Sequence, residues 1–99
     1  MKILENMIEE LEDEIEGARD YAEKYIDCKA RGNAMRATKY KEMAHDELRH
    51  FSTLREFFAA DVDGIKRVHP LTEEEVSWWE HEHKKLNDKV AMIHHLLST

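Results

Sequence analysis

Two copies of one short motif stand close together in the segment KEMAHDELRH, residues 41–50. The first is Glu42-x-x-His45 and the second is Glu47-x-x-His50. A carboxylate and an imidazole three residues apart on a helix project from neighbouring points of one face, where they can bind the same metal ion. The apolar residues around the two motifs decide which pair faces the interior.

The apolar stripe of the segment 34–60 separates the two pairs. At about 100° per residue this stripe surrounds Glu47, and His50 lies about 60° from Glu47 on the same stripe. Glu42 and His45 point about 140° and 160° away, on the opposite, polar face. The stripe consists of Tyr40, Met43, Ala44, Phe51, Leu54 and Phe58. Periodicity therefore predicts Glu47 and His50 as the inward-facing pair.

A further acidic residue interrupts the apolar stripe of the segment 3–31. Apolar residues recur there at spacings of three and four, and Glu14 fills a gap in the series. The apolar members are Met7, Leu11, Ala18, Tyr21, Tyr25 and Cys28. No Lys or Arg lies on either stripe, so a bound cation is the simplest compensation for Glu14 and Glu47. Alternatively, the two glutamates extend to water at the stripe edge or share a proton.

Three helices are predicted to position these residues. Gly32-Asn33 suits a left-handed helix end and a tight turn, and the stretch 61–71 contains the second break. Thr72 and Glu75 form a capping-box pattern at the start of the last helix. The predicted helices cover residues 3–31, 34–60 and 72–98, to within a few residues. We expect one all-α domain over 1–99, in which the first two helices form a long antiparallel hairpin.

Composition limits the kinds of partner. Charged residues make up 37% of the chain, with one proline and three glycines, which favours long solvated helices. The net charge is −7 and the basic residues are scattered, so we expect neither nucleic acid nor an anionic membrane as a partner. No run approaches the roughly 20 apolar residues of a membrane span, and the acidic start is unlike a secretory signal. We therefore expect a soluble, cytoplasmic protein.

The single cysteine limits the kinds of metal site. Cys28 has no partner for an intrachain disulfide and no thiolate cluster for structural zinc. Any metal must therefore be bound by carboxylates and imidazoles, which suit iron, manganese or zinc.

The combined pattern resembles the ferritin-like superfamily, in which an inward glutamate on the first helix precedes Glu-x-x-His on the second. Here Glu14 is followed 33 residues later by Glu47-x-x-His50. The flanking segments LEDEIEGARDYAEKY and YKEMAHDELRHFSTL also resemble the small ferritin-like proteins of bacteria and their phages. The resemblance covers residues 4 to 58 and is greatest to the two-helix half-ferritins, which are related to the encapsulated ferritins.

This resemblance implies a homodimer or a larger homo-oligomer. One chain supplies half of the ligand set of a ferritin-like four-helix bundle, and two hairpins would complete it across a twofold axis. The implied cofactor is iron, two ions per dimer, with Glu14, Glu47 and His50 as metal-binding and catalytic residues. The implied activity is that of a ferroxidase, which oxidises Fe(II) with O2 or peroxide. Storage of iron would need a larger shell or compartment, since a dimer of this size encloses no mineral.

One tyrosine is a candidate for supporting this site. Tyr21 lies two turns after Glu14 and in phase with it. Its hydroxyl is placed to hydrogen-bond a ligand carboxylate, as groups around metal ligands commonly do. The alternative is that Tyr21 simply packs against Tyr25.

The third predicted helix repeats the same spacing in Glu80-x-x-His83. Its apolar stripe predicts that it covers its own hairpin or a neighbouring subunit. The stripe consists of Val76, Trp79, Leu86, Val90, Ile93 and Leu97. Because no fourth helix supplies a matching glutamate, we interpret Glu80 and His83 as a polar flank and not as ligands.

A competing hypothesis belongs to another class of protein. In it, the chain is a non-catalytic helical assembly protein whose Glu14, Glu47 and His50 hold a structural divalent metal such as zinc or calcium, or no metal. An electron-transfer role of the rubrerythrin kind is disfavoured, because the cysteines of a rubredoxin site are absent.

Overall fold

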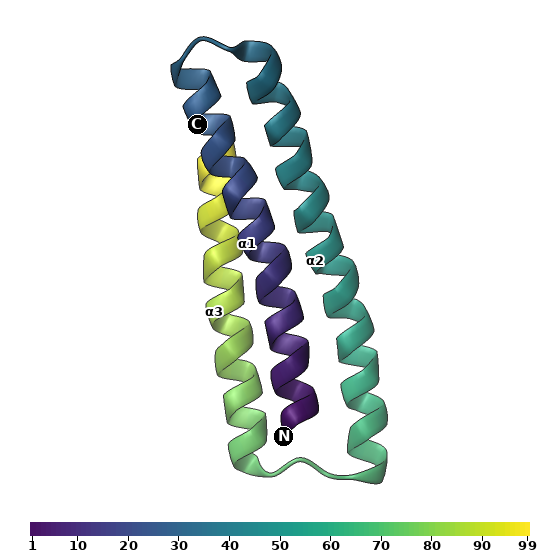
Figure 1. Ribbon diagram of the computed structural model, residues 1–99. Coiled ribbons are helices and arrows are strands. Elements are labelled where there is room, and N and C mark those ends of the chain that lie inside the picture. The colour runs from purple at the N-terminus through teal and green to yellow at the C-terminus, as the bar shows by residue number, and fades with distance from the viewer.

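The computed structural model describes all residues, 1–99, and contains three long helices. They are α1 (Lys2–Ala30), α2 (Ala34–Val68) and α3 (Glu73–Leu97). α1 and α2 form a hairpin, and α3 returns alongside α1 (Figure 1). α1 packs extensively against both other helices, whereas α2 and α3 have little direct contact. The molecule is therefore a rod of 55 × 19 × 18 Å with α1 as its central helix, which confirms the predicted all-α hairpin with a third helix.

Local sequence accounts for both turns. Gly32 adopts a φ of +78°, the left-handed conformation that ends α1, and the Asn33 side chain accepts a hydrogen bond from the backbone N–H of Arg36 at 3.2 Å. At the other turn, Thr72 Oγ1 accepts from the Glu75 N–H at 3.1 Å, and Glu75 accepts from the Thr72 N–H at 3.0 Å. The predicted turn and the predicted capping box are both confirmed.

The end of α2 was predicted wrongly. The helix continues past residue 60 to Val68, through most of the stretch expected to be a loop. Gly64 costs about 1 kcal/mol in a helix interior. Burial of Val62 beside Leu4 and Met7 contributes about 1.5–3 kcal/mol, so the helix is favoured. It ends at His69, where the following proline disfavours helical backbone.

A heptad seam on α1 forms the core. Its members recur at alternating spacings of four and three and are all buried. They are Leu4, Ile8, Leu11, Ile15, Ala18, Ala22 and Tyr25. Met7, Leu11, Ala18 and Tyr25 of the expected stripe are buried, but Ile8, Ile15 and Ala22 are buried beside them. The buried surface is thus shifted to one side of Glu14, which borders the core and does not interrupt it. The shift arises because α1 has to cover two helices and not one.

The third helix packs on α1 through the predicted stripe, of which Leu86, Ile93 and Leu97 are fully buried. His83 lies on its flank, with its ring centroid 4.4 Å from that of Trp79. The buried Nε2 of His83 has no hydrogen-bond partner, and burial together with the nearby Arg55 charge lowers the pKa of His83. His83 is thus packed against Trp79 with its charged form disfavoured, while Glu80 is exposed to solvent. None of the three helices carries an uncharged apolar run long enough to cross a membrane.

Candidate metal centre

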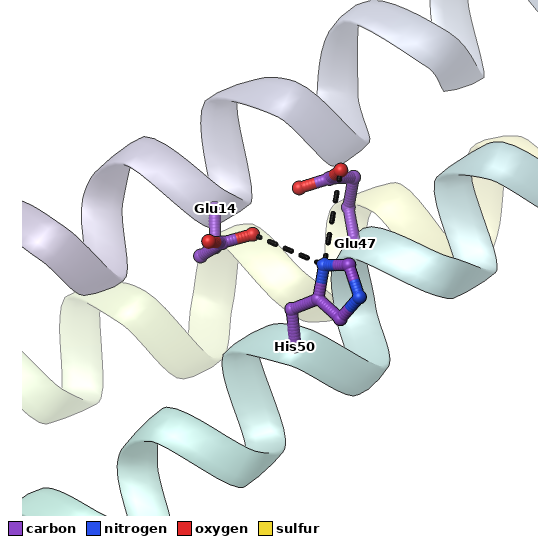
Figure 2. Close-up of side chains that lie close together, drawn as sticks. All are labelled: Glu14, Glu47 and His50. Atoms are coloured by element: carbon purple, nitrogen blue, oxygen red, sulfur yellow. Dashed lines mark ion pairs between the residues drawn. The ribbon is translucent and has the colours of Figure 1, made fainter.

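Three side chains from two helices converge midway along the hairpin. Glu14 projects from α1, and Glu47 and His50 project from adjacent turns of α2 (Figure 2). His50 Nδ1 lies 3.7 Å from Glu14 Oε2 and 3.9 Å from Glu47 Oε1. One ligand atom from each residue lies within 4.8 Å of the other two. The three residues selected by periodicity therefore form a candidate metal site of two carboxylates and one imidazole.

The site lies at the edge of the core and opens to solvent. The side chains of Glu14 and Glu47 are 27% and 26% exposed, and that of His50 is 61% exposed. The expectation that Glu47 and His50 lie within the apolar seam was too strong. α2 directs Ala44, Leu48 and Phe51 into the core, and the ligand residues occupy the adjacent side of the helix.

The carboxylates of Glu14 and Glu47 repel each other, and neither forms an ion pair with a Lys or Arg. Their only ion-pair partner is His50. The pKa of Glu14 is raised above its ordinary value of 4.5, first by the side-chain hydrogen bond with Glu47, then by burial and by the charge of Glu47. The charge of His50 opposes this shift only in part. A divalent cation bound here would remove the repulsion that a proton relieves in its absence.

Replacing Glu14 by glutamine should stabilise the metal-free protein at neutral pH. The pKa of Glu14 is higher in the folded state than its value of 4.5 in the unfolded chain. Glu14 therefore stabilises the fold fully below pH 4.5, and this stabilisation is lost as the pH rises through the raised pKa. Glu14→Gln does not undergo this loss. In denaturant unfolding with a chelator present to keep the protein metal-free, its midpoint should therefore exceed that of the natural chain at pH 7 but not at pH 4.

The control is Glu23→Gln, which removes one exposed negative charge from the same helix. An equal gain in that variant would assign the effect to net charge and not to the Glu14–Glu47 contact. Added divalent metal should make the natural chain more stable than Glu14→Gln, because Glu14→Gln lacks one of the three candidate ligands.

A glycine on α1 lets the Glu47 carboxylate approach the helix closely. A Cβ atom at Gly17 would lie 3.2 Å from Glu47 Oε2, closer than most real Cβ contacts. Gly17 stands one turn after Glu14 and thus beside the site. Gly17 is not recognisable as a functional residue from the sequence, because a glycine inside a helix carries no chemical signal until its neighbour across the hairpin is known.

Gly17→Ala should weaken metal binding about tenfold, the lower range of effects seen for groups that orient metal ligands. The new methyl group would push the Glu47 carboxylate aside by a few tenths of an ångström. Gly64→Ala is the matched control, since a Cβ there meets nothing within 4 Å. It should raise stability by about 1 kcal/mol and leave affinity unchanged. Competition titration of Zn²⁺ against a chromophoric chelator measures the metal affinity of both variants. Equal affinities for Gly17→Ala and the natural chain would contradict the role of this contact.

The other sequence candidates lie elsewhere. Glu42 is exposed and pairs with Lys39 at 3.6 Å. His45 lies on the side of α2 away from Glu47, as expected, and its ring is 6.3 Å, centroid to centroid, from that of His94 on α3. Tyr21 stacks on Tyr40 with centroids 6.2 Å apart. A hydrogen bond from Tyr21 to a ligand carboxylate stays a prediction.

The ligand set fits a divalent cation that prefers oxygen and imidazole. Metal–ligand distances of about 2.0–2.2 Å require the donor atoms to approach one another to roughly 3 Å, which small rotations of these partly exposed side chains permit. Three ligands leave coordination positions unfilled on the solvent side. One chain therefore contains a possible metal site that is open to solvent.

Comparisons with protein-family models, with curated proteins and with solved structures found no match.

Proposed function

We propose that the chain is a ferritin-like protein that dimerises through the open face of the α1–α2 hairpin and oxidises Fe(II) at a two-iron centre between the subunits. The observation that carries this proposal is the convergence of Glu14, Glu47 and His50 with no Lys or Arg partner. The residue pattern of the half-ferritins supports it. Two such sets facing across a twofold axis supply four carboxylates and two imidazoles.

Exposed apolar side chains beside the site support pairing on this face. Met43 and Phe57 stand two turns before and two turns after His50 on α2, and both are exposed. At about 100° per residue each lies within about 20° of the direction of His50. Exposed apolar side chains on both sides of a candidate metal-binding residue, here His50, are typical of surfaces that contact another protein.

The same face continues as an apolar groove towards the C-terminal end of α2. Ile3 and Met7 of α1 and Ile65 and Val68 of α2 line this groove. α3 leaves the face open, because it borders α1 near Ile15, about 100° around the helix from Glu14. A second hairpin could therefore cover both the ligand residues and the groove.

Iron is the substrate of the proposed reaction. Two Fe(II) ions give one electron each to O2, which takes up two protons and leaves as H2O2; with peroxide as the oxidant, two protons are taken up and two waters leave. Carboxylate oxygens favour the more highly charged Fe(III) over Fe(II), which assists loss of the electron. The neighbouring Glu47 raises the pKa of Glu14, and a bound cation would favour the ionised form of both carboxylates.

The proposal is tested by loading metal-free protein with Fe(II) under anaerobic conditions and then admitting O2 or peroxide. Bound iron, oxidant consumption and particle mass are measured for the natural chain and for Glu47→Ala. We expect one iron per chain, a dimer or larger particle, and oxidation faster than in the variant. Metal binding without accelerated oxidation would favour the non-catalytic assembly protein with a structural metal. Absence of iron binding would reject the two-iron centre and leave the non-catalytic assembly protein, with another divalent metal or with none.

A further inference from the structure

A polar groove lies between α2 and α3, away from the candidate metal centre. At about 100° per residue its direction on α2 is about 160° from Glu47. The groove exists because α2 and α3 both pack on α1 and have little contact with each other. Its lining residues are His45, Leu48, Arg49, Ser52 and Thr53 of α2 and His94 of α3.

Hydrogen-bond donors dominate this lining. Arg49 offers guanidinium N–H groups, Ser52 and Thr53 offer hydroxyls, and each imidazole offers at least one N–H in any protonation state. Neither hydroxyl donates back to the helix backbone, as Thr38 does to the Ala34 carbonyl. No carboxylate lines the groove, although acidic residues outnumber basic ones 22 to 15 in the chain.

Arg49 remains able to bind an additional acceptor. It forms an ion pair with Asp46, one turn earlier on α2 and outside the groove lining. Only one terminal nitrogen of the guanidinium engages in that pair, and the group has five N–H donors in all. Its other donors are free to point into the groove.

We propose that this groove binds a small tetrahedral oxyanion, with phosphate as its simplest form. The ring centroids of His45 and His94 are 6.3 Å apart, on opposite sides of the opening. An anion seated in the groove beside this ring pair can accept bonds from imidazole N–H groups, from Arg49 and from the hydroxyls of the lining. A divalent cation is disfavoured, because the guanidinium repels it and no carboxylate compensates its charge.

The test is an NMR titration of the ¹⁵N-labelled, metal-free full chain with sodium phosphate at neutral pH, against sodium chloride at equal ionic strength. We expect saturable shifts at residues 45–53 and at His94, competition by sulfate, and no saturation with chloride. Arg49→Gln and His94→Ala should each weaken phosphate binding about tenfold, the effect of losing one charge-assisted hydrogen bond. Both residues are exposed, so neither variant endangers the fold.

Two matched variants complete the test. Arg19→Gln removes an arginine that pairs with Glu16 as Arg49 pairs with Asp46, and His95→Ala removes the exposed neighbour of His94. Neither should change phosphate affinity. Equal weakening by these controls, shifts that do not saturate, or saturation of the groove by Zn²⁺ but not by phosphate would overturn the proposal.

Discussion

Replacing Glu47 or His50 by alanine should abolish stoichiometric metal binding. Each substitution removes one of three converging ligand groups and leaves two that cannot hold an ion alone. The affinity should fall by more than about 100-fold, the upper range for groups that only orient ligands. Elemental analysis after Fe(II) or Zn²⁺ loading and desalting measures the bound metal. Both side chains lie at the edge of the core, so the helical content should not change.

The same helix supplies a matched control with the same motif. Glu42→Ala and His45→Ala alter the other Glu-x-x-His pair and should leave the bound metal unchanged. Glu42 pairs with Lys39, and His45 faces α3, so neither approaches Glu14. Equal losses of metal from both pairs would contradict the assignment of the site, whatever activity the protein has.

A charge at Phe57 should prevent the proposed dimer. The Phe57 side chain is 59% exposed and lies two turns from His50, on the face where a second hairpin would pack. Phe57→Glu would bury a carboxylate in that interface, and the twofold axis would bury two. The dimer Kd should rise by more than about 100-fold, which corresponds to about 2.7 kcal/mol. Analytical ultracentrifugation of the metal-loaded protein measures the change, and Fe(II) oxidation should be lost in parallel.

Met92→Glu is the matched control for this prediction. Met92 is similarly exposed, at 63%, but lies on α3 and away from the ligand face. It should neither dissociate the particle nor slow oxidation. A dimer that survives Phe57→Glu and dissociates with Met92→Glu would show that the subunits associate through α3 instead.

Much of the fold follows from short-range signals. The Gly32-Asn33 turn and the Thr72–Glu75 capping box act within a few residues, so they are visible in the sequence without knowledge of the rest of the molecule. The end of α2 is different. Gly64 marks a break locally, but burial of Val62 against Leu4 and Met7, about 60 residues away in the chain, outweighs it.

The candidate site also has features that follow from the sequence alone and features that depend on the tertiary structure. The direction in which each side chain of α2 points depends only on residues within that helix. The sequence by itself therefore distinguished Glu47 and His50 from Glu42 and His45, although both pairs have the same Glu-x-x-His spacing. The helical repeat is a property of the backbone and needs no partner.

The tertiary structure alone decided where these residues lie relative to the core. α1 packs against two helices, so its buried surface extends beyond the expected stripe to Ile8, Ile15 and Ala22 and leaves Glu14 at the border with solvent. The same packing brings Gly17 against the Glu47 carboxylate and opens the groove between α2 and α3. These features depend on distances between helices, and the periodicity of one helix contains no information about what approaches it from outside.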